Sequence, residues 1–153
     1  MPEEIRRVVI GHNAEGHATV IYDDVKRITG DDWPGTDAPL WMTKGFPISN
    51  EGSEDTSLGE ATWSGGTIFR VIAFPPGRAG GMHRTDSTDY IVVMRGEVDM
   101  DLDDGSTVHL KPGDTLVQRG TAHAWMNRGT ETCLAAFVMI QSHEIPGLPE
   151  ISR

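Results

Sequence analysis

The chain is poor in the residues on which disulfides, nucleic-acid binding and membrane insertion depend. Cys133 is its one cysteine, so no disulfide can form within the chain. Its 13 lysines and arginines are outnumbered by 23 aspartates and glutamates, and the net charge of -10 repels both a phosphate backbone and an anionic lipid surface. No apolar run approaches the roughly 20 residues of a membrane span. We therefore expect neither nucleic acid nor a membrane among its partners.

Length and composition indicate one globular domain in the cytoplasm. A chain of 153 residues fits one hydrophobic core, and 37% hydrophobic with 24% charged residues is ordinary for a folded soluble protein. The N-terminal Met-Pro-Glu-Glu-Ile-Arg-Arg lacks the apolar stretch of a signal peptide, which favours a cytoplasmic location. We expect an N-terminal β extension with loops over residues 1–65, a barrel over 66–140 and a tail over 141–153. Cys133 lies in an apolar run and is expected to be buried and unreactive.

Short apolar or alternating runs, separated by turn residues, predict an all-β chain. The expected strands are residues 5–10, 18–22, 40–43, 67–74, 89–94, 97–102, 107–110, 115–117, 122–126 and 133–140. Asp103-Asp104-Gly105 marks a tight hairpin, because Asp and Gly tolerate the positive φ of such a turn. Strands that follow one another without helical crossovers form antiparallel sheets. The one short helical turn that the sequence allows lies near residues 23–29.

Strand alternation brings chemically useful side chains to one side of the expected barrel. Residues two apart face the same way, so His83, Thr85 and Asp89 would point inward, and His123 would join them from a later strand. Two imidazoles and a carboxylate are a ligand set of non-haem iron(II), and zinc accepts the same donors. The same residues also allow a metal-free site, in which a histidine is the general acid or base and Asp89 orients it.

The spacing of these residues resembles the first motif of the cupin superfamily. That motif runs Gly, five residues, His-x-His, three or four residues, Glu, six residues, Gly. Here Gly77 is followed at the same spacings by His83, Thr85, Asp89 and Gly96. Thr85 stands where the family has its second histidine, and Asp89 stands where it has glutamate.

The second motif of the family follows later in the chain. Gly120, His123 and Asn127 keep its spacing of two and then three intervening residues. The resemblance covers about residues 77–127 and implies a jelly-roll barrel, also called a double-stranded β-helix, which is often a homodimer. It also implies a metal held by three histidines and one glutamate, and of that set this chain offers His83, Asp89 and His123.

From this resemblance the expected cofactor is a divalent ion, Fe, Mn, Ni or Zn, at these three residues. Cupins include oxygenases, decarboxylases, isomerases and binding proteins, so three functions compete. The first is a metal-dependent enzyme acting on a small organic molecule. The second, which Thr85 favours, is a metal-free cupin that binds or isomerises a small ligand. The third is a sensory or binding module without catalysis.

Further side chains are assigned to a ligand pocket or to the surface. Thr85, whose hydroxyl could hold a water or a substrate oxygen, joins Gln118, Trp125 and Phe69 as candidates for the pocket lining. Alternation turns Arg84 away from His83, toward the surface or an interface. The histidines expected to face solvent are His12, His17, His109 and His143.

Overall fold

A computed structural model describes residues 3–28, 36–58 and 65–151. Within these ranges the chain is all-β except for one turn of 3-10 helix, η1 (Thr56–Leu58). The strands are β1 (Glu3–His12), β2 (Ala18–Ile28), β3 (Asp37–Lys44), β4 (Gly66–Phe74), β5 (Ser87–Arg95), β6 (Val98–Leu102), β7 (Thr107–Leu110), β8 (Thr115–Arg119), β9 (His123–Met126) and β10 (Cys133–Gln141). Each expected strand is therefore confirmed, in most cases one or more residues longer than the sequence pattern indicated.

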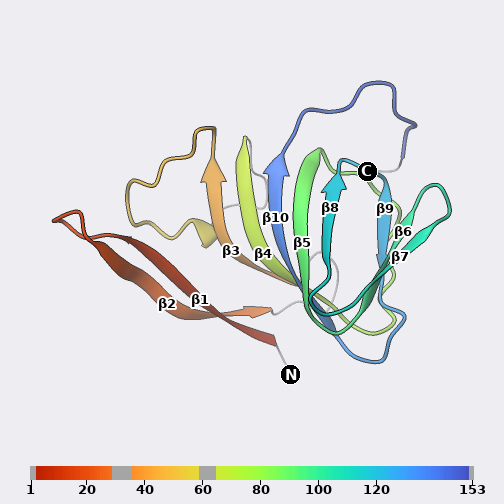
Figure 1. The fold of residues 1–153 in the computed structure, drawn as a ribbon, viewed down its shortest axis with the longest axis horizontal. Helices are drawn as coiled ribbons and strands as arrows, with labels where there is room; N and C mark the ends of the chain where they lie inside the picture. Colours follow the sequence, from red (N-terminus) through yellow and green to blue (C-terminus); the bar gives the residue numbers. More distant parts are fainter. Residues whose placement is uncertain (1–2, 29–35, 59–64, 152–153) are drawn as a thin grey trace.

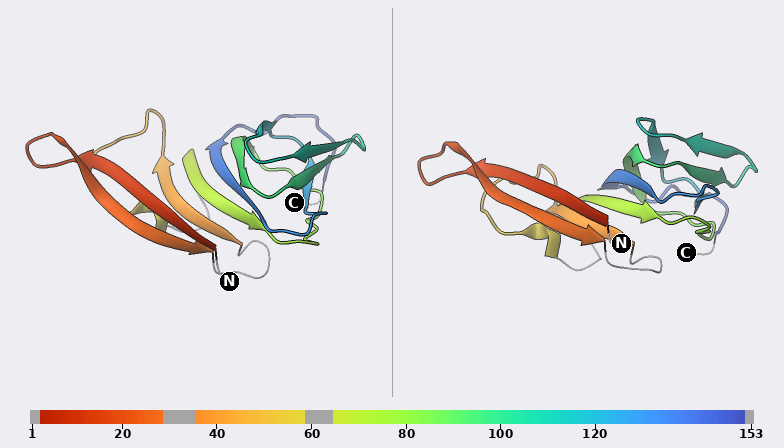
Figure 2. Two further views of the ribbon diagram at one scale, coloured as in Figure 1. Left: turned by 60° about the horizontal axis from the view of Figure 1, so that its bottom comes forward. Right: turned by 90° about the horizontal axis from the view of Figure 1, so that it is seen from below.

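Two antiparallel sheets form the jelly roll. The larger has the order β3-β4-β10-β5-β8, and the smaller has the order β7-β6-β9. The strands run side by side in Figure 1, and the views in Figure 2 show the smaller sheet standing over one end of the larger. Non-consecutive neighbours such as β10 and β4 arise because the chain crosses repeatedly from one sheet to the other. The all-β jelly roll expected from the sequence is confirmed.

The segment 78–83 extends the smaller sheet beyond β9. Isolated bridges join Ala79 to Met126 and His83 to His123, both antiparallel. The amide of His83 donates to the carbonyl oxygen of His123 at 2.9 Å, and the reverse bond has the same length. This doubly bonded pair fixes two distant parts of the sequence side by side.

The core lies between the two sheets. Inward residues of both sheets form one buried cluster, which includes Ile72, Phe74, Ile91, Met100, Trp125, Cys133 and Phe137. Each fully buried side chain of this size contributes about 2 kcal/mol through removal from water. Cys133 is fully buried, as predicted, and burial raises the pKa of its thiol to about 11.

An N-terminal arm, formed by the β1–β2 hairpin, projects from the edge of the larger sheet (Figure 1). The helical turn expected near residues 23–29 is wrong for residues 23–28, because this segment continues β2 and pairs with β1; residue 29 lies outside the described ranges. Charged residues such as Asp23 and Arg27 suggested a loop, but they lie opposite residues of β1 that complete a strand ladder. Cross-strand pairing decides the structure here over local composition.

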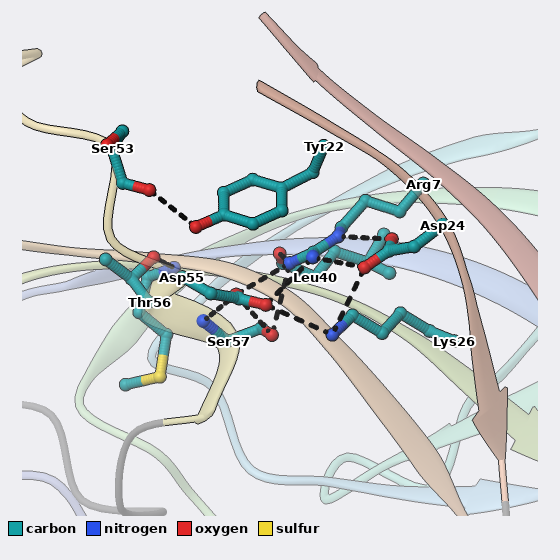
Figure 3. A network of polar contacts seen from close by, with 10 residues as sticks. Arg7, Tyr22, Asp24, Lys26, Leu40, Ser53, Asp55, Thr56 and Ser57 are labelled. Atoms are coloured by element: carbon teal, nitrogen blue, oxygen red, sulfur yellow. Dashed lines mark hydrogen bonds and ion pairs between the residues drawn. The ribbon is translucent and has the colours of Figure 1, made fainter. Parts of the chain in front are cut away.

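Arg7 joins the arm to the body of the protein (Figure 3). Its side chain is only 3% exposed and donates to Asp24 on β2, to Asp55 beside η1 and to the carbonyl oxygen of Leu40 on β3. The guanidinium carbon also lies 5.0 Å from the ring centroid of Tyr22. A buried guanidinium needs such partners, because an unpaired charge in the interior is strongly destabilising.

No helix in the described ranges is long and apolar enough to cross a membrane.

Candidate functional site

His83 and His123 form the centre of the site. They lie directly opposite each other on neighbouring strand segments, and their ring centroids are 4.5 Å apart at an interplanar angle of 55°. The side chain of His123 is buried, whereas that of His83 is partly exposed. The structure therefore brings together two imidazoles that are 40 residues apart in the sequence.

Backbone carbonyl groups determine which ring nitrogen of each histidine is free. Nδ1 of His83 lies 2.8 Å from the carbonyl oxygen of Gly81, and Nδ1 of His123 lies 2.8 Å from that of Thr121. Because a carbonyl oxygen only accepts, each Nδ1 must carry the proton. In the neutral ring Nε2 then holds the lone pair and is the nitrogen available to a substrate or a metal ion.

The environment of His123 favours its neutral form. Burial lowers the pKa of its imidazole below the ordinary value of 6.5, and the positive charge that His83 can carry acts in the same direction. The hydrogen bond to the carbonyl of Thr121 and the nearby Asp89 oppose this shift without cancelling it. At neutral pH the imidazole of His123 is therefore uncharged.

Asp89 lies beside the imidazoles, but its oxygens are occupied. Its side chain is buried on β5; Oδ1 accepts a hydrogen bond from the Ser87 hydroxyl at 2.6 Å, and Oδ2 accepts one from Nε2 of Gln118 at 3.1 Å. Asp89 and Gln118 are directly paired across β5 and β8, which explains their contact. Thr85 lies 3.0 Å from the Ser87 hydroxyl and so belongs to the same network.

Gln118 connects this network to His123. Its Oε1 accepts hydrogen bonds from the backbone amide of Thr121 at 2.6 Å and from its hydroxyl at 3.1 Å. The carbonyl of Thr121 in turn holds Nδ1 of His123. A continuous path therefore runs from Asp89 through Gln118 and Thr121 to the imidazole. Ser87 and Thr121 were not predicted. For Ser87 the available signal was its position two residues before Asp89 on the same face of β5, whereas Thr121 precedes β9 and had no such signal.

Comparison with known proteins identifies the family. The family model for the cupin domain matches residues 70–140. Over 150 residues the chain is 31% identical to the cupin-domain-containing oxidoreductase fogC of Aspergillus ruber, an alignment that includes 91% of this chain and 73% of that protein.

This chain belongs to the cupin family.

Other relatives of this cupin match over shorter parts of their length. Identity is 52% over 93 residues with the phomopsin biosynthesis cluster protein C' of Diaporthe leptostromiformis, which covers 61% of this chain and 49% of the relative. It is 33% over 129 residues with the cupin-domain-containing oxidoreductase virC of Hypocrea virens, where the coverages are 79% and 66%. A solved double-stranded β-helix domain protein from Klebsiella pneumoniae matches with a TM-score of 0.46 and 27% identity, over 50% of this chain and 68% of that one.

As arranged in this structure, the side chains of this cupin do not form the metal site that the family implies. Among the described residues, no group of three or more His, Cys, Asp and Glu side chains is arranged to hold an ion. His83 and His123 each offer one free nitrogen, but Thr85 replaces a third imidazole and both oxygens of Asp89 accept bonds within the protein. Catalytic zinc sites have three protein ligands. The predicted set of His83, Asp89 and His123 would require Asp89 to exchange partners before it could bind metal.

The predicted pocket residues do not all face the interior between the two sheets. Trp125 lies in the interior with its ring 6.1 Å from that of His123, and with Phe74, Arg78 and His83 it lines a small pocket of about 40 Å³. Phe69 is 41% exposed on the outer face of β4, because Ile68 and Ile72 occupy the inward positions of that strand. The structure therefore does not bring Phe69 to the imidazoles.

The remaining predictions concern charged surface residues. Nη1 of Arg84 donates to the carbonyl oxygen of Pro149 and so connects the barrel to the C-terminal tail. The exposed residues His12, His17 and His143 face solvent as expected. His109 is also exposed, but both of its ring nitrogens contact carboxylate groups on β6 and next to it.

Proposed function

We propose that this cupin is an enzyme that acts on a small organic molecule by proton transfer at His83 and His123. The observation that carries the proposal is the pair of facing imidazoles, each with Nδ1 bound to a carbonyl oxygen. A base held in one tautomer presents the same nitrogen in every catalytic cycle. General acid–base catalysis by a positioned side chain typically contributes about 10²- to 10⁴-fold in rate.

The names of the relatives suggest the reaction class. Two of them are named as cupin-domain-containing oxidoreductases and one as a biosynthesis cluster protein. We therefore propose that the reaction is an oxidation or reduction of a biosynthetic intermediate. In the oxidising direction, the substrate would lose two electrons and two protons to a diffusible two-electron acceptor such as a quinone, which would become the hydroquinone, and His123 would relay one of these protons.

The two histidines and Asp89 have different roles in this proposal. Because burial favours its neutral form, His123 takes the proton from the substrate, and His83 on the adjoining segment holds the reacting group near Nε2. Asp89 is a positioning residue: it has no direct hydrogen bond to His123, and its bonded path to the imidazole runs through Gln118 and Thr121.

A metal-dependent oxygenase, decarboxylase or isomerase is the second candidate. It is favoured by the carbonyl bonds to both Nδ1 atoms, because metal-binding histidines commonly donate their other N–H to a carbonyl oxygen or a carboxylate. His83 and His123 would hold Fe, Mn, Ni or Zn, with Asp89 as third ligand after release from Ser87 or Gln118. The ion would supply Lewis acidity to a bound carbonyl or hydroxyl group.

Elemental analysis separates the two candidates. The protein would be purified without a metal-affinity tag, and parent, His83→Ala and His123→Ala would be compared before and after incubation with Fe(II), Mn(II), Ni(II) or Zn(II). Proton transfer without metal predicts well below one ion per chain in all three proteins. One ion per chain in the parent, lost in both variants, would establish the metal-dependent function instead.

Complementation tests the catalytic role without a known substrate. In a source strain that lacks the gene, the parent should restore normal metabolite content, whereas His83→Ala, His123→Ala and the double variant should accumulate the same intermediate. The double variant should be no worse than either single one, because the residues serve one centre. Arg6→Met, on the exposed side of the arm, is the control and should restore the parent pattern. Restoration by both histidine variants would rule out the proposed centre.

A further inference from the structure

The pocket at the imidazoles is too small to hold an organic substrate. Its volume is about 40 Å³, and a cavity needs about 10–15 Å³ by the same measure to hold one water molecule. Ligand pockets for molecules of drug size are about 300–1,000 Å³. Only the reacting end of a substrate can therefore lie against His83, and the rest of the molecule needs another place.

A larger pocket of about 330 Å³ opens between β7 and β8. These strands are consecutive and are joined by residues 111–114, yet they belong to different sheets, β7 at the edge of the smaller and β8 at the edge of the larger. Side chains from both edges and from β6 line the pocket. We refer to it as the seam pocket.

The seam pocket adjoins the imidazole site. Leu102, which lines it, is the cross-strand partner of His123, and Gln118, which also lines it, is the partner of Asp89. Partner side chains in an antiparallel pair share a sheet face, with Cβ atoms about 4.5–5.5 Å apart. Thr121 lies on the pocket wall as well, and its carbonyl oxygen accepts the bond from His123. A molecule in this pocket is thus one strand spacing from the proposed base.

The walls of the seam pocket determine which molecules fit. Met100, Leu102, Val108 and Leu116 make most of the lining apolar. Next to the buried Gln118, the hydroxyl of the exposed Thr121 donates to Oε1 of Gln118, and its oxygen remains able to accept a bond from a ligand O–H or N–H group.

The rim of the seam pocket is acidic. Asp103 and Asp104 both line it. Hydrogen bonds from the hydroxyl and the amide of Ser106 hold the pKa of Asp104 below its usual value. With a net charge of -10 on the whole chain, this rim disfavours anionic ligands.

We propose that the seam pocket holds the body of the substrate of His83 and His123, and that it selects an uncharged, mainly apolar molecule with a hydroxyl or N–H group next to Thr121. The proposal rests on the proposed function for the reaction at the two imidazoles. It assigns substrate selection to Val108 and Leu116, on the two strands that face each other across the seam.

Binding of fluorescent probes tests the pocket independently of any reaction. N-phenyl-1-naphthylamine is uncharged and apolar, and 8-anilino-1-naphthalenesulfonate has similar rings with one negative charge. The full chain should bind the uncharged probe at least tenfold more tightly than the sulfonate. Val108→Trp, which fills the pocket from β7, should weaken binding of the uncharged probe at least tenfold. Val20→Trp, at a 56% exposed position of the arm, is the matched control and should bind like the parent.

A second variant and a spectroscopic readout complete the test. Leu116→Trp fills the pocket from β8 and should have the same effect if Val108→Trp fails to fold. The uncharged probe should also shift the imidazole NMR signals of His123 in the parent. Unchanged probe affinity in a folded Trp variant, preference for the sulfonate, or no shift at His123 would each overturn the proposal.

The outcomes distinguish this proposal from the proposed function. His83→Ala and His123→Ala remove the chemistry but leave the apolar walls, so they should keep probe affinity within about twofold of the parent. Probe binding as expected, together with restored metabolites in both histidine variants, would support the seam pocket and refute the reaction centre. Lost complementation in the two histidine variants, together with unchanged probe binding in both Trp variants, would support the reaction centre and refute the seam pocket.

Discussion

Replacing Arg7 by Met tests how the arm is attached. The change keeps an unbranched apolar chain but removes a guanidinium that donates to Asp24, Asp55, Leu40 and Ser57. Loss of one partner from a buried ion pair costs about 3–5 kcal/mol. We expect about 3 kcal/mol of lost unfolding free energy, near the lower limit, because the Asp24 side chain is already 39% exposed and rehydrates readily.

Arg6→Met is the matched control, because Arg6 precedes Arg7 in the same strand and also forms a two-bond pair with an aspartate. Its side chain is 70% exposed, however, and exposed pairs contribute little. Urea denaturation of both variants, with hydrogen exchange of the β1 and β2 amides, makes the comparison. Equal loss of stability in Arg6→Met and Arg7→Met would refute the view that burial makes this attachment strong.

The pH dependence of the Arg7 contribution follows from its partners. The hydrogen bond from Arg7 is the main cause that holds the pKa of Asp55 far below its ordinary value of 3.8. A group whose folded pKa is depressed stabilises the protein above its unfolded pKa and loses this effect as pH falls. The stability difference between parent and Arg7→Met should therefore be full at pH 6 and shrink below about pH 4.

Three further predictions concern a surface ion cluster, a turn and the assembly. The hydrogen bonds that His109 donates to Asp99 and then to Glu97 raise the pKa of its imidazole above 6.5. The stabilisation that charged His109 gives is therefore complete below pH 6.5 and is lost as the pH rises through the higher pKa of the folded state. The urea midpoints of the parent and of His109→Gln should then converge by pH 9. Gly96→Ala should lower the free energy of unfolding, measured by urea denaturation, by roughly 2 kcal/mol, because φ is +70° and the new Cβ would lie 2.6 Å from a carbonyl oxygen. Gly81→Ala is the control and should lower it much less, because no atom lies within 4 Å of the new Cβ. Finally, the apolar outer face of the larger sheet favours a homodimer. Analytical ultracentrifugation should therefore give a molecular mass of about twice 16.7 kDa. A monomer mass at micromolar concentration would contradict this.

The barrel strands could be predicted from the sequence because each carries its own signal. In β5, for example, Asp89, Ile91 and Val93 face inward while Tyr90 and Val92 face outward, as strict alternation requires. Turn residues such as Gly105 fixed the ends of the hairpins. Segment 23–28 had no such pattern, because the side of β2 that faces the body carries the charged residues Asp24 and Lys26, which form ion pairs there. Its strand depends on pairing with β1, which local sequence does not reveal.

The site was only partly predictable for a related reason. Motif spacing located His83, Asp89 and His123, but the bonds of Asp89 to Ser87 and Gln118 depend on strand register and side-chain geometry. Register is a property of two strands, and a one-residue slip reverses every side chain. The alternation of side chains along β4 likewise places Phe69 on the outer face of the larger sheet, although we expected it in the pocket lining. The buried Arg7 had no sequence signal, because its burial arises from packing of the arm against β3 and η1.

The boundary between β7 and β8 makes the barrel adjustable in the course of evolution. Two paired strands can separate only by losing the hydrogen bonds of their ladder, whereas two edges of different sheets are kept together mainly by side chains and by the turn at residues 111–114. Insertions in that turn, or exchanges of Val108 and Leu116, would change the width of the opening while the sheet that positions His123 keeps its hydrogen bonds. Relatives of this chain could thus come to accept larger or smaller molecules through a few substitutions at one joint, with the reacting groups left in place.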